Sequence, residues 1–461
     1  RITRLKHKVP RGQRLSQGMS TPACSFEVVA HHSLQPSYAR SFEAVDALRR
    51  WSSAPTETLA RSWSEINSFA SNLQLGRRVT QLARDVCGRQ GLRGVETLAG
   101  IPPEKYVADQ TLWDALEYGD TMLVKGSWLM KRAGVMVDGS GDCEPKPLPR
   151  RQDFVEKFPS GFWKVDELKD LMTAGCVVIV AVSYCWLTEE HPDPEGKQLQ
   201  LLAHVIRRFL EGSGLEDIAV FIDWCSLHQR PRVHHEELSF ARALRDVHLW
   251  YAHQGTRVWM LTGATGAADV EHSCAAYAAR GWPSFERMLS EMVTKRSFLL
   301  DIGLIEPERL LDSEWHDITK ACEAHRSPPP TPESFAEALP DKVFSLGDED
   351  RRIVATAYSR AFMELISGAE ELAFSNLDWG DFEARQLAAT LPRCTRLTKL
   401  TLYGNSIGAE GASALAAVLH FCECLDELWL TGNPICRQKE GRELLCEAWE
   451  SAGKHQDGLH V

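Results

Sequence analysis

The chain of 461 residues is long enough for about three domains, and its hydrophobic fraction of 44% can supply their cores. A net charge of −11 argues against nucleic acid as a partner, because phosphate contacts need a basic surface. No apolar run of about 18 residues occurs, so no membrane span is expected. The 13 scattered cysteines favour reduced thiols of a cytoplasmic protein over a disulfide framework.

The first part of the chain shows no strand pattern. Residues 1–38 are basic and aperiodic, which predicts a disordered arm, and the start at Arg1 leaves targeting unassigned. Residues 39–150 are predicted to be mostly helical, since apolar side chains recur at helical spacing from Phe42 onward. A Pro-rich stretch ends this region and marks a boundary before residue 151.

Residues 151–325 alternate apolar runs with amphipathic segments. Long apolar runs are typical of strands buried on both faces of a parallel sheet. The predicted strands are Val177–Val182, Ile218–Ile222, Arg257–Thr262 and Phe298–Leu300, with helices over Lys197–Glu211, Phe240–Tyr251 and Trp282–Met292 between them. This alternation predicts βαβ crossovers and an α/β domain whose sheet has helices on both faces.

The C-terminal part contains an internal repeat. Residues 326–368 are predicted to be a stiff Pro-rich linker followed by a short helix. In residues 369–461, similar motifs begin at Leu372, Leu400 and Leu428, 28 residues apart, in the pattern of a leucine-rich repeat followed by a C-terminal helix. So few repeats cannot form a large concave face. We therefore expect the array to pack on the preceding domain and to add a small binding surface.

Polar and aromatic residues follow the predicted strands. Ligands of open parallel sheets bind beyond the carboxyl ends of the strands, so these residues are the candidate site. They are Ser183, Tyr184 and Trp186 after the first strand, Asp223 after the second, and Trp282 and Glu286 in the helix after the third. Each has a structural alternative: the aromatic rings could pack the sheet edge, Asp223 could cap a turn, and Glu286 could pair with Arg280 or Arg287.

Two further patterns suggest weaker sites. Cys225, His228, His234 and His235 could bind zinc, but their spacing fits no standard template and favours a His-rich surface loop, so no metal site is predicted. The segment 263–266 could approach a phosphate, yet it lacks the Lys of a P-loop and favours a plain turn.

The motifs of the central domain resemble those of the TIR and HET (heterokaryon-incompatibility) superfamily. They are Ser183-Tyr-Cys-Trp186, Asp223 with Cys225 and Gln229, and Arg280-Gly-Trp282 with Glu286, over about residues 176–295. The repeat resembles the ribonuclease-inhibitor type over about residues 370–436. The whole arrangement resembles uncharacterised multidomain proteins of protists and algae. Pro283 departs from the pattern, because TIR enzymes usually carry a Cys there.

The resemblance implies a flavodoxin-like parallel sheet and two alternative functions. The first is an intracellular signalling protein, whose repeats bind a protein partner and whose TIR/HET-like domain associates with its own kind. The second is an NAD glycohydrolase, a hydrolase with NAD as substrate and no prosthetic group. There Glu286 is the catalytic carboxylate that stabilises an oxocarbenium-like transition state. The residues that would line the NAD site are Ser183, Tyr184, Trp186, Asp223 and Trp282.

Overall fold

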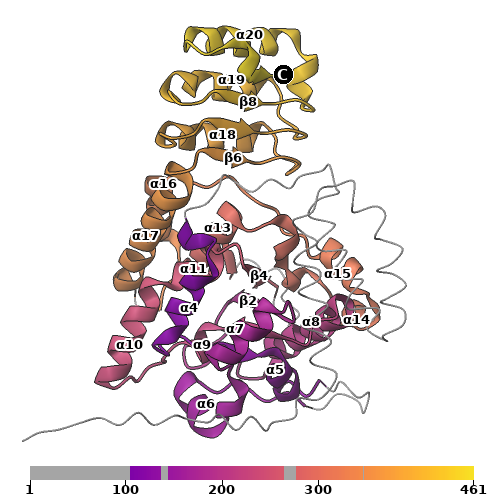
Figure 1. The fold of residues 1–461 in the computed structure, drawn as a ribbon, viewed down its shortest axis with the longest axis vertical. Helices are drawn as coiled ribbons and strands as arrows, with labels where there is room; N and C mark the ends of the chain where they lie inside the picture. The colour runs from indigo at the N-terminus through magenta and orange to yellow at the C-terminus, as the bar shows by residue number, and fades with distance from the viewer. Residues whose placement is uncertain (1–103, 136–143, 264–276, 346) are drawn as a thin grey trace, which may run out of the picture. The chain divides into compact units, whose positions relative to one another are not determined.

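A computed structural model describes residues 104–135, 144–263, 277–345 and 347–461 of the chain (Figure 1). The predicted arm, most of the predicted N-terminal helices and most of the segment 263–266 lie outside these described residues. Within them the protein is an α/β protein with a five-stranded, mostly parallel sheet and a four-stranded parallel sheet, both flanked by helices. Among the described helices, none combines the length and the apolar character needed to cross a membrane.

The five-stranded sheet has the order β1-β3-β2-β4-β5. Its strands are β1 (Val124–Lys125), β2 (Val177–Tyr184), β3 (Asp217–Phe221), β4 (Thr256–Leu261) and β5 (Leu299–Asp301). The four strands expected from the apolar runs are confirmed, and they pair in parallel. Strand β1 was not predicted, and it runs antiparallel to β3. Because β1 precedes residue 151, part of the expected N-terminal region contributes to this sheet.

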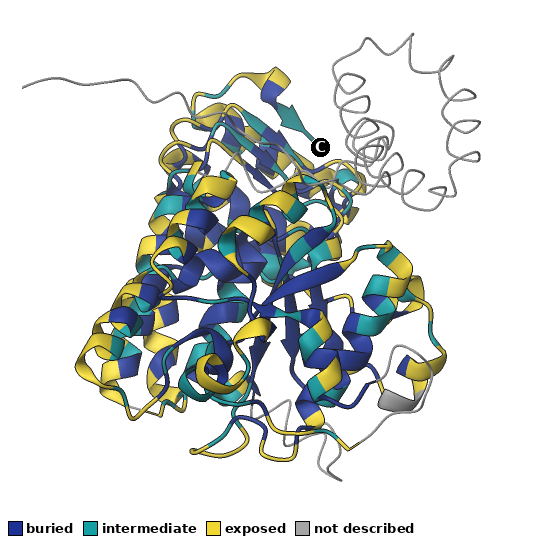
Figure 2. Ribbon diagram, turned by 60° about the horizontal axis from the view of Figure 1, so that its bottom comes forward, coloured by how far each residue is buried: buried dark blue, intermediate teal, exposed yellow. Residues whose placement is uncertain are grey.

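Helices cover both faces of this sheet, so most residues of its strands are buried (Figure 2). One core includes residues of α5 (Gly126–Arg132), α6 (Arg151–Lys157), α8 (Lys197–Ser213), α9 (Asp223–Ser226), α14 (Pro307–Asp312) and α15 (Trp315–Ala321). The other includes residues of α4 (Asp109–Glu117), α7 (Val165–Thr173), α10 (His234–Arg245), α11 (Val247–Ala252) and α13 (Gly281–Val293). The single helix predicted up to Tyr251 is therefore two helices, which meet at Asp246.

Strand β2 sends alternate side chains into the two cores, as a pleated strand must. Ile179 and Ala181 belong to the core that includes α13, whereas Val180 and Val182 belong to the core that includes α8. The same alternation continues to the end of the strand, so Ser183 faces α13 and Tyr184 faces the other core. Two adjacent residues of one motif are therefore directed to opposite faces.

Helix α13 begins where the chain passes another segment at very close range. A Cβ atom at Gly281 would lie 1.9 Å from the Phe344 ring, so any larger residue would require this ring to move. The Gly281 N–H donates to the Val343 carbonyl, and Pro283 occupies the first turn, where its missing N–H costs nothing. Phe285 and Leu289 then bury the inner face of the helix against the sheet. These contacts fix the helix that carries Glu286.

The C-terminal repeats form the second sheet. Strands β6 (Glu371–Ala373), β7 (Lys399–Thr401) and β8 (Glu427–Trp429) pair in parallel with a shift of 28 residues, as the repeat predicted. Helices α18 (Asp381–Thr390), α19 (Ala409–Val418) and α20 (Lys439–Ser451) stack beside them (Figure 1). A fourth strand, β9 (Leu459–His460), pairs with β8 and was not predicted.

The Pro-rich segment after residue 325 is packed between the two sheets. The Pro329 carbonyl accepts a hydrogen bond from Thr390 of α18, and the Pro330 carbonyl accepts one from Tyr358. Two helices follow, α16 (Pro332–Ala338) and α17 (Asp348–Phe362), and a π-helical turn, Met363–Ser367, ends the second. One apolar cluster runs from the five-stranded sheet through these helices into the repeats, so the array packs on the preceding domain as expected.

Candidate functional site

The structure brings Ser183 and Glu286 together across 103 residues of chain. Ser183 is the seventh residue of β2, and Glu286 lies in the second turn of α13. The Ser183 hydroxyl donates a hydrogen bond of 2.6 Å to Oε2 of Glu286. Ser183 is fully buried and Glu286 is 8% exposed, so this carboxyl group has little contact with water. The pair lies at the carboxyl end of the central strand, where the sheet topology places ligand sites.

Two tyrosines complete the surroundings of the carboxyl group. The Tyr277 hydroxyl lies 2.7 Å from Oγ of Ser183 and 3.5 Å from the Pro283 carbonyl oxygen. Tyr251 of α11 lies close to Glu286, and its single hydroxyl proton can donate either to that carboxylate or to the Val182 carbonyl, which is 3.3 Å away. When Glu286 is ionised, Ser183 donates to it and Tyr277 donates to Ser183. When Glu286 is protonated, the chain can reverse, since Tyr277 can then donate to Pro283.

Burial raises the pKa of Glu286 from its ordinary 4.5 to about 8. The negative charge of nearby Asp223 contributes to this rise in pKa, and the hydrogen bonds from Ser183 and Tyr251 oppose it. No ion pair joins Glu286 to a basic residue among the described residues, and the expected alternative partner Arg287 binds Glu291 at 2.6 Å. Glu286 is therefore a buried carboxyl group that accepts hydrogen bonds from hydroxyl groups, and the described part of the chain supplies no cation to balance its charge.

Asp223 organises a second cluster on the opposite face of β2. The Tyr184 hydroxyl donates to Oδ1 of Asp223 at 2.7 Å, and the Trp186 indole donates to Oδ2 at 3.0 Å. Asp223 also accepts from the N–H of the adjacent Trp224 at 2.6 Å. It does not cap the following turn as the alternative proposed, because Asp223 is the first residue of α9 and Ile222 holds the N-cap position. Burial raises the pKa of Asp223, and these three hydrogen bonds oppose that rise. The electrostatic effect of Asp223 on Glu286 links the two clusters.

Trp282 lies apart from both hydrogen-bonded clusters. It is half-buried near the start of α13 and meets Phe285 edge-on, with the two ring centroids 6.0 Å apart. Of the six predicted site residues, the structure thus joins Ser183 to Glu286 and joins Tyr184 and Trp186 to Asp223. It gives Trp282 a packing contact.

Two members of the site were missed by the sequence reasoning. Tyr251 was noted only as an apolar residue of a helix, and Tyr277 was not assigned to any element. Both hydroxyl groups lie in an almost fully buried setting, which raises their pKa values well above 10. A buried tyrosine usually has a partner for its hydroxyl group, but the sequence does not name that partner.

The His-rich segment does not gather metal ligands. Cys225 is buried and its thiol contacts the Pro149 carbonyl at 3.3 Å, whereas His228 lies 3.7 Å from Glu236. Within the described residues no group of three His, Cys, Asp or Glu side chains could hold a metal ion. This segment therefore offers no alternative metal chemistry to the Glu286 site.

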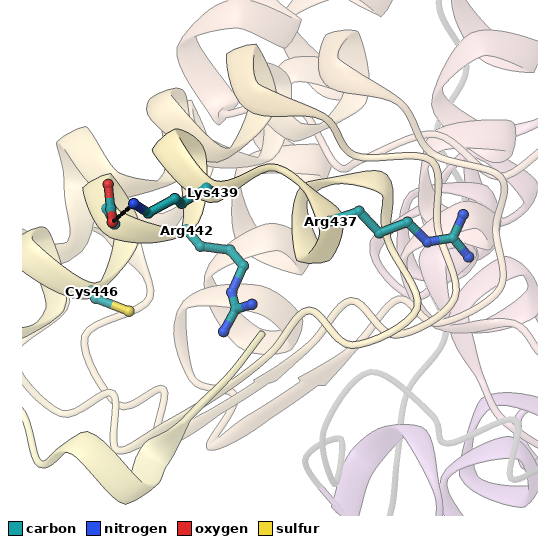
Figure 3. A pocket seen from close by; sticks show the side chains of 5 residues that line it. Arg437, Lys439, Arg442 and Cys446 are labelled. Carbon is teal, nitrogen blue, oxygen red and sulfur yellow. Dashed lines mark ion pairs between the residues drawn. The ribbon is translucent and has the colours of Figure 1, made fainter.

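The repeats carry a basic pocket of about 310 Å³. It is lined by Arg437, Lys439, Arg442, Glu443 and Cys446. Lys439 pairs with Glu443 at 3.6 Å, and Figure 3 shows the Arg437 side chain directed away from Arg442. The basic groups do not converge on one point, so the pocket does not define a ligand.

Comparison of the chain with known protein families, with curated proteins and with solved structures found no match. Function is therefore inferred from the geometry of the Glu286 site. A buried carboxyl group with a raised pKa, held at a strand end by hydroxyl donors, can accept or donate a proton near neutral pH. Once ionised, it can also stabilise a positive charge brought in by a ligand.

Proposed function

We propose that the site binds NAD and hydrolyses the bond between nicotinamide and ribose, with Glu286 as the catalytic carboxylate. The observation that carries the proposal is the buried Glu286 carboxyl group, which has hydroxyl donors and no cationic partner among the described residues. A buried carboxylate favours an opposite charge nearby. The nicotinamide ring of NAD carries a positive charge, and the transition state for its departure places positive charge on the ribose.

The fold supports the same proposal. The four parallel strands have the order second, first, third, fourth along the chain, which is that of flavodoxin-like sheets. In such sheets the carboxyl end of the first strand borders the ligand site, and Ser183 is there. Together with the motifs around Trp186, Asp223 and Glu286, this order supports a TIR/HET-like domain followed by leucine-rich repeats.

In the reaction, the bond from the ribose anomeric carbon to the nicotinamide nitrogen breaks, and its electron pair leaves with neutral nicotinamide. Water attacks the anomeric carbon, and the ionised Glu286 orients this water and accepts its proton. Ser183 and Tyr251 stabilise the ionised form through their hydrogen bonds. Because NAD is cationic at the nicotinamide, its binding lowers the pKa of Glu286 and releases a proton when Glu286 was protonated beforehand.

The test measures release of nicotinamide by the purified chain at high concentration, so that self-association can occur. Glu286→Gln keeps the shape of the side chain and removes its charge, so we expect turnover to fall by at least a hundredfold. Glu447→Gln removes one charge from an exposed position of α20 and serves as the control. Equal turnover in the wild type and Glu286→Gln would refute the catalytic role, and no turnover by the wild type would refute the proposed function.

A second function, protein interaction in signalling, is favoured by the exposed aromatic surface of the repeats. Tyr403 is 47% exposed just after β7, and Phe421 and Phe382 of the same repeats are 57% and 60% exposed. Exposed aromatic residues are common at protein interfaces. The signalling function also requires the TIR/HET-like domain to associate with its own kind. Analytical ultracentrifugation of the chain over a range of concentrations tests this self-association. A monomer at every concentration would contradict it.

A further inference from the structure

One buried residue connects the repeats to the helix that carries Glu286. Arg326 is 8% exposed and lies in the Pro-rich segment between the two sheets. Its guanidinium donates to the Glu291 carbonyl through Nε and to the Met292 carbonyl through Nη2, the latter at 2.5 Å. These carbonyls belong to the last turn of α13, where a helix lacks internal donors. A cation at this end also interacts favourably with the helix dipole.

The repeats hold Arg326 from the other side. The Trp379 indole donates to the Arg326 carbonyl at 2.7 Å, and the Phe374 ring lies 5.2 Å from the guanidinium. Both aromatic residues belong to the first repeat and are fully buried. Arg326 therefore links the repeats to the end of α13 through three hydrogen bonds. The Trp379 indole binds the Arg326 carbonyl, and the Arg326 guanidinium binds two carbonyls of α13.

A second set of contacts holds the same end of α13. The Glu291 carboxylate, 1% exposed, accepts from the Ser327 N–H at 3.2 Å and pairs with Arg287 at 2.6 Å. Ser327 directly follows Arg326, so a movement of this segment acts on both attachments. Glu286 lies six residues before Met292, which is about 9 Å along a helix axis. A helix over this length moves nearly as a rigid rod.

We propose that Arg326 is a positioning residue for Glu286, through which the repeats control the geometry of the carboxyl group. The regulatory role rests on the proposed function, whereas the mechanical link does not. A displacement of α13 changes the 2.6 Å bond between Ser183 and Glu286, which tolerates only a few tenths of an ångström. A partner that binds the first repeat and shifts Trp379 would therefore alter the activity at a distance.

The test replaces Trp379 by Phe, which removes the indole donor and keeps an aromatic ring. Trp449→Phe is the matched control, because the Trp449 indole also donates to a carbonyl at 2.7 Å, that of His455, within the last repeat. Hydrogen exchange of the peptide that covers residues 281–293 reports on α13 directly. We expect exchange in Trp379→Phe to be about fivefold to tenfold faster, the factor that one lost buried hydrogen bond implies, and to be unchanged in Trp449→Phe.

The second measurement is the pH dependence of nicotinamide release. A purely structural role of Arg326 would leave this pH dependence unchanged. We expect the acid limb of kcat in Trp379→Phe to move to lower pH, because a loosened α13 admits water to Glu286, with kcat reduced and KM unchanged. Arg326→Lys, which keeps the charge but loses the paired donation, is the second variant and should act in the same direction. If Trp379→Phe does not fold, hydrogen exchange and the pH profile of Arg326→Lys test the positioning role instead.

The two proposals fail separately. Equal exchange of α13 in Trp379→Phe and Trp449→Phe overturns the positioning role, even when the wild type hydrolyses NAD. Faster exchange in Trp379→Phe without any wild-type turnover keeps the mechanical link and overturns the proposed function. Faster exchange with an unshifted pH profile in an active protein shows that α13 moves without affecting Glu286, and it overturns the regulatory role.

Discussion

Replacing Glu286 by Gln is expected to make the folded protein more stable above neutral pH. The folded protein holds this carboxyl group protonated up to a pKa of about 8, whereas its ordinary value is 4.5. Between these two values the unfolded chain releases the proton and the folded protein retains it. The free energy of unfolding of the wild type therefore falls as the pH rises through this interval. Gln has no proton to release, so its contribution stays constant.

The magnitude follows from the two pKa values. The interval from 4.5 to about 8, at about 1.36 kcal/mol for each pH unit, corresponds to about 5 kcal/mol. Below pH 4.5 both forms of the chain carry the proton and this contribution is fully present. Above pH 8 it is lost. Since Gln offers a carbonyl oxygen to the Ser183 hydroxyl, the substitution keeps the hydrogen bond and changes mainly the ionisation.

The assay compares urea unfolding of the wild type and Glu286→Gln from about pH 5 to about pH 9, followed by tryptophan fluorescence. The difference between the two free energies of unfolding should grow by about 1.4 kcal/mol per pH unit up to about pH 8 and then level off. Buried groups that do not interact with Glu286 titrate equally in both proteins and cancel. The exposed control Glu447→Gln should give a flat difference. A flat difference for Glu286→Gln would mean that Glu286 is ionised in the folded protein, and the argument from its burial would fail.

Two further substitutions test the site and the repeats. Ser183→Ala removes a hydrogen bond that lowers the pKa of Glu286, so the pH at which the stability profile levels off should rise. The free energy of unfolding should also fall by about 1–3 kcal/mol. If the profile levels off at the same pH as in the wild type, Ser183 is not the donor. Asn405→Ala removes four hydrogen bonds, to the Leu377 and Trp379 N–H groups and to the Phe374 and Leu402 carbonyls, and should lower the unfolding free energy by about 4 kcal/mol in urea titration. A loss below about 1 kcal/mol would contradict the proposed contribution of these four hydrogen bonds.

Periodic features were predictable because each residue in them follows from its neighbours in sequence. The repeat of 28 residues placed Leu372, Leu400 and Leu428 in one register, and the structure pairs them in adjacent strands. The apolar runs likewise located four strands of the larger sheet to within one or two residues. The short strands β1 and β9 were not predicted, because two residues are too few to show a hydrophobic period.

The candidate site was predictable only in part. Its strand-end residues could be named because strand ends are visible in the hydropathy pattern, and Glu286 could be named because its motif marks the start of a helix. The hydrogen-bond partners of these residues could not be named from the sequence. The bond from Ser183 to Glu286 joins residues 103 positions apart, and Tyr277 reaches Ser183 across 94 positions. No local pattern encodes which of several buried hydroxyl groups such a carboxyl group will meet.

The sequence by itself determined four strands of the larger sheet, the approximate positions of the helices between them, the repeats and the sheet edge at which polar residues gather, because these follow from hydrophobic periodicity and from the fixed direction of parallel crossovers. The tertiary structure alone decided that Ser183 and Tyr184 face opposite cores, that Glu286 is buried without a cation among the described residues, and that Arg326 joins the repeats to α13. Those outcomes depend on distant segments meeting in space, and burial sets the energy of a charge only once its surroundings exist.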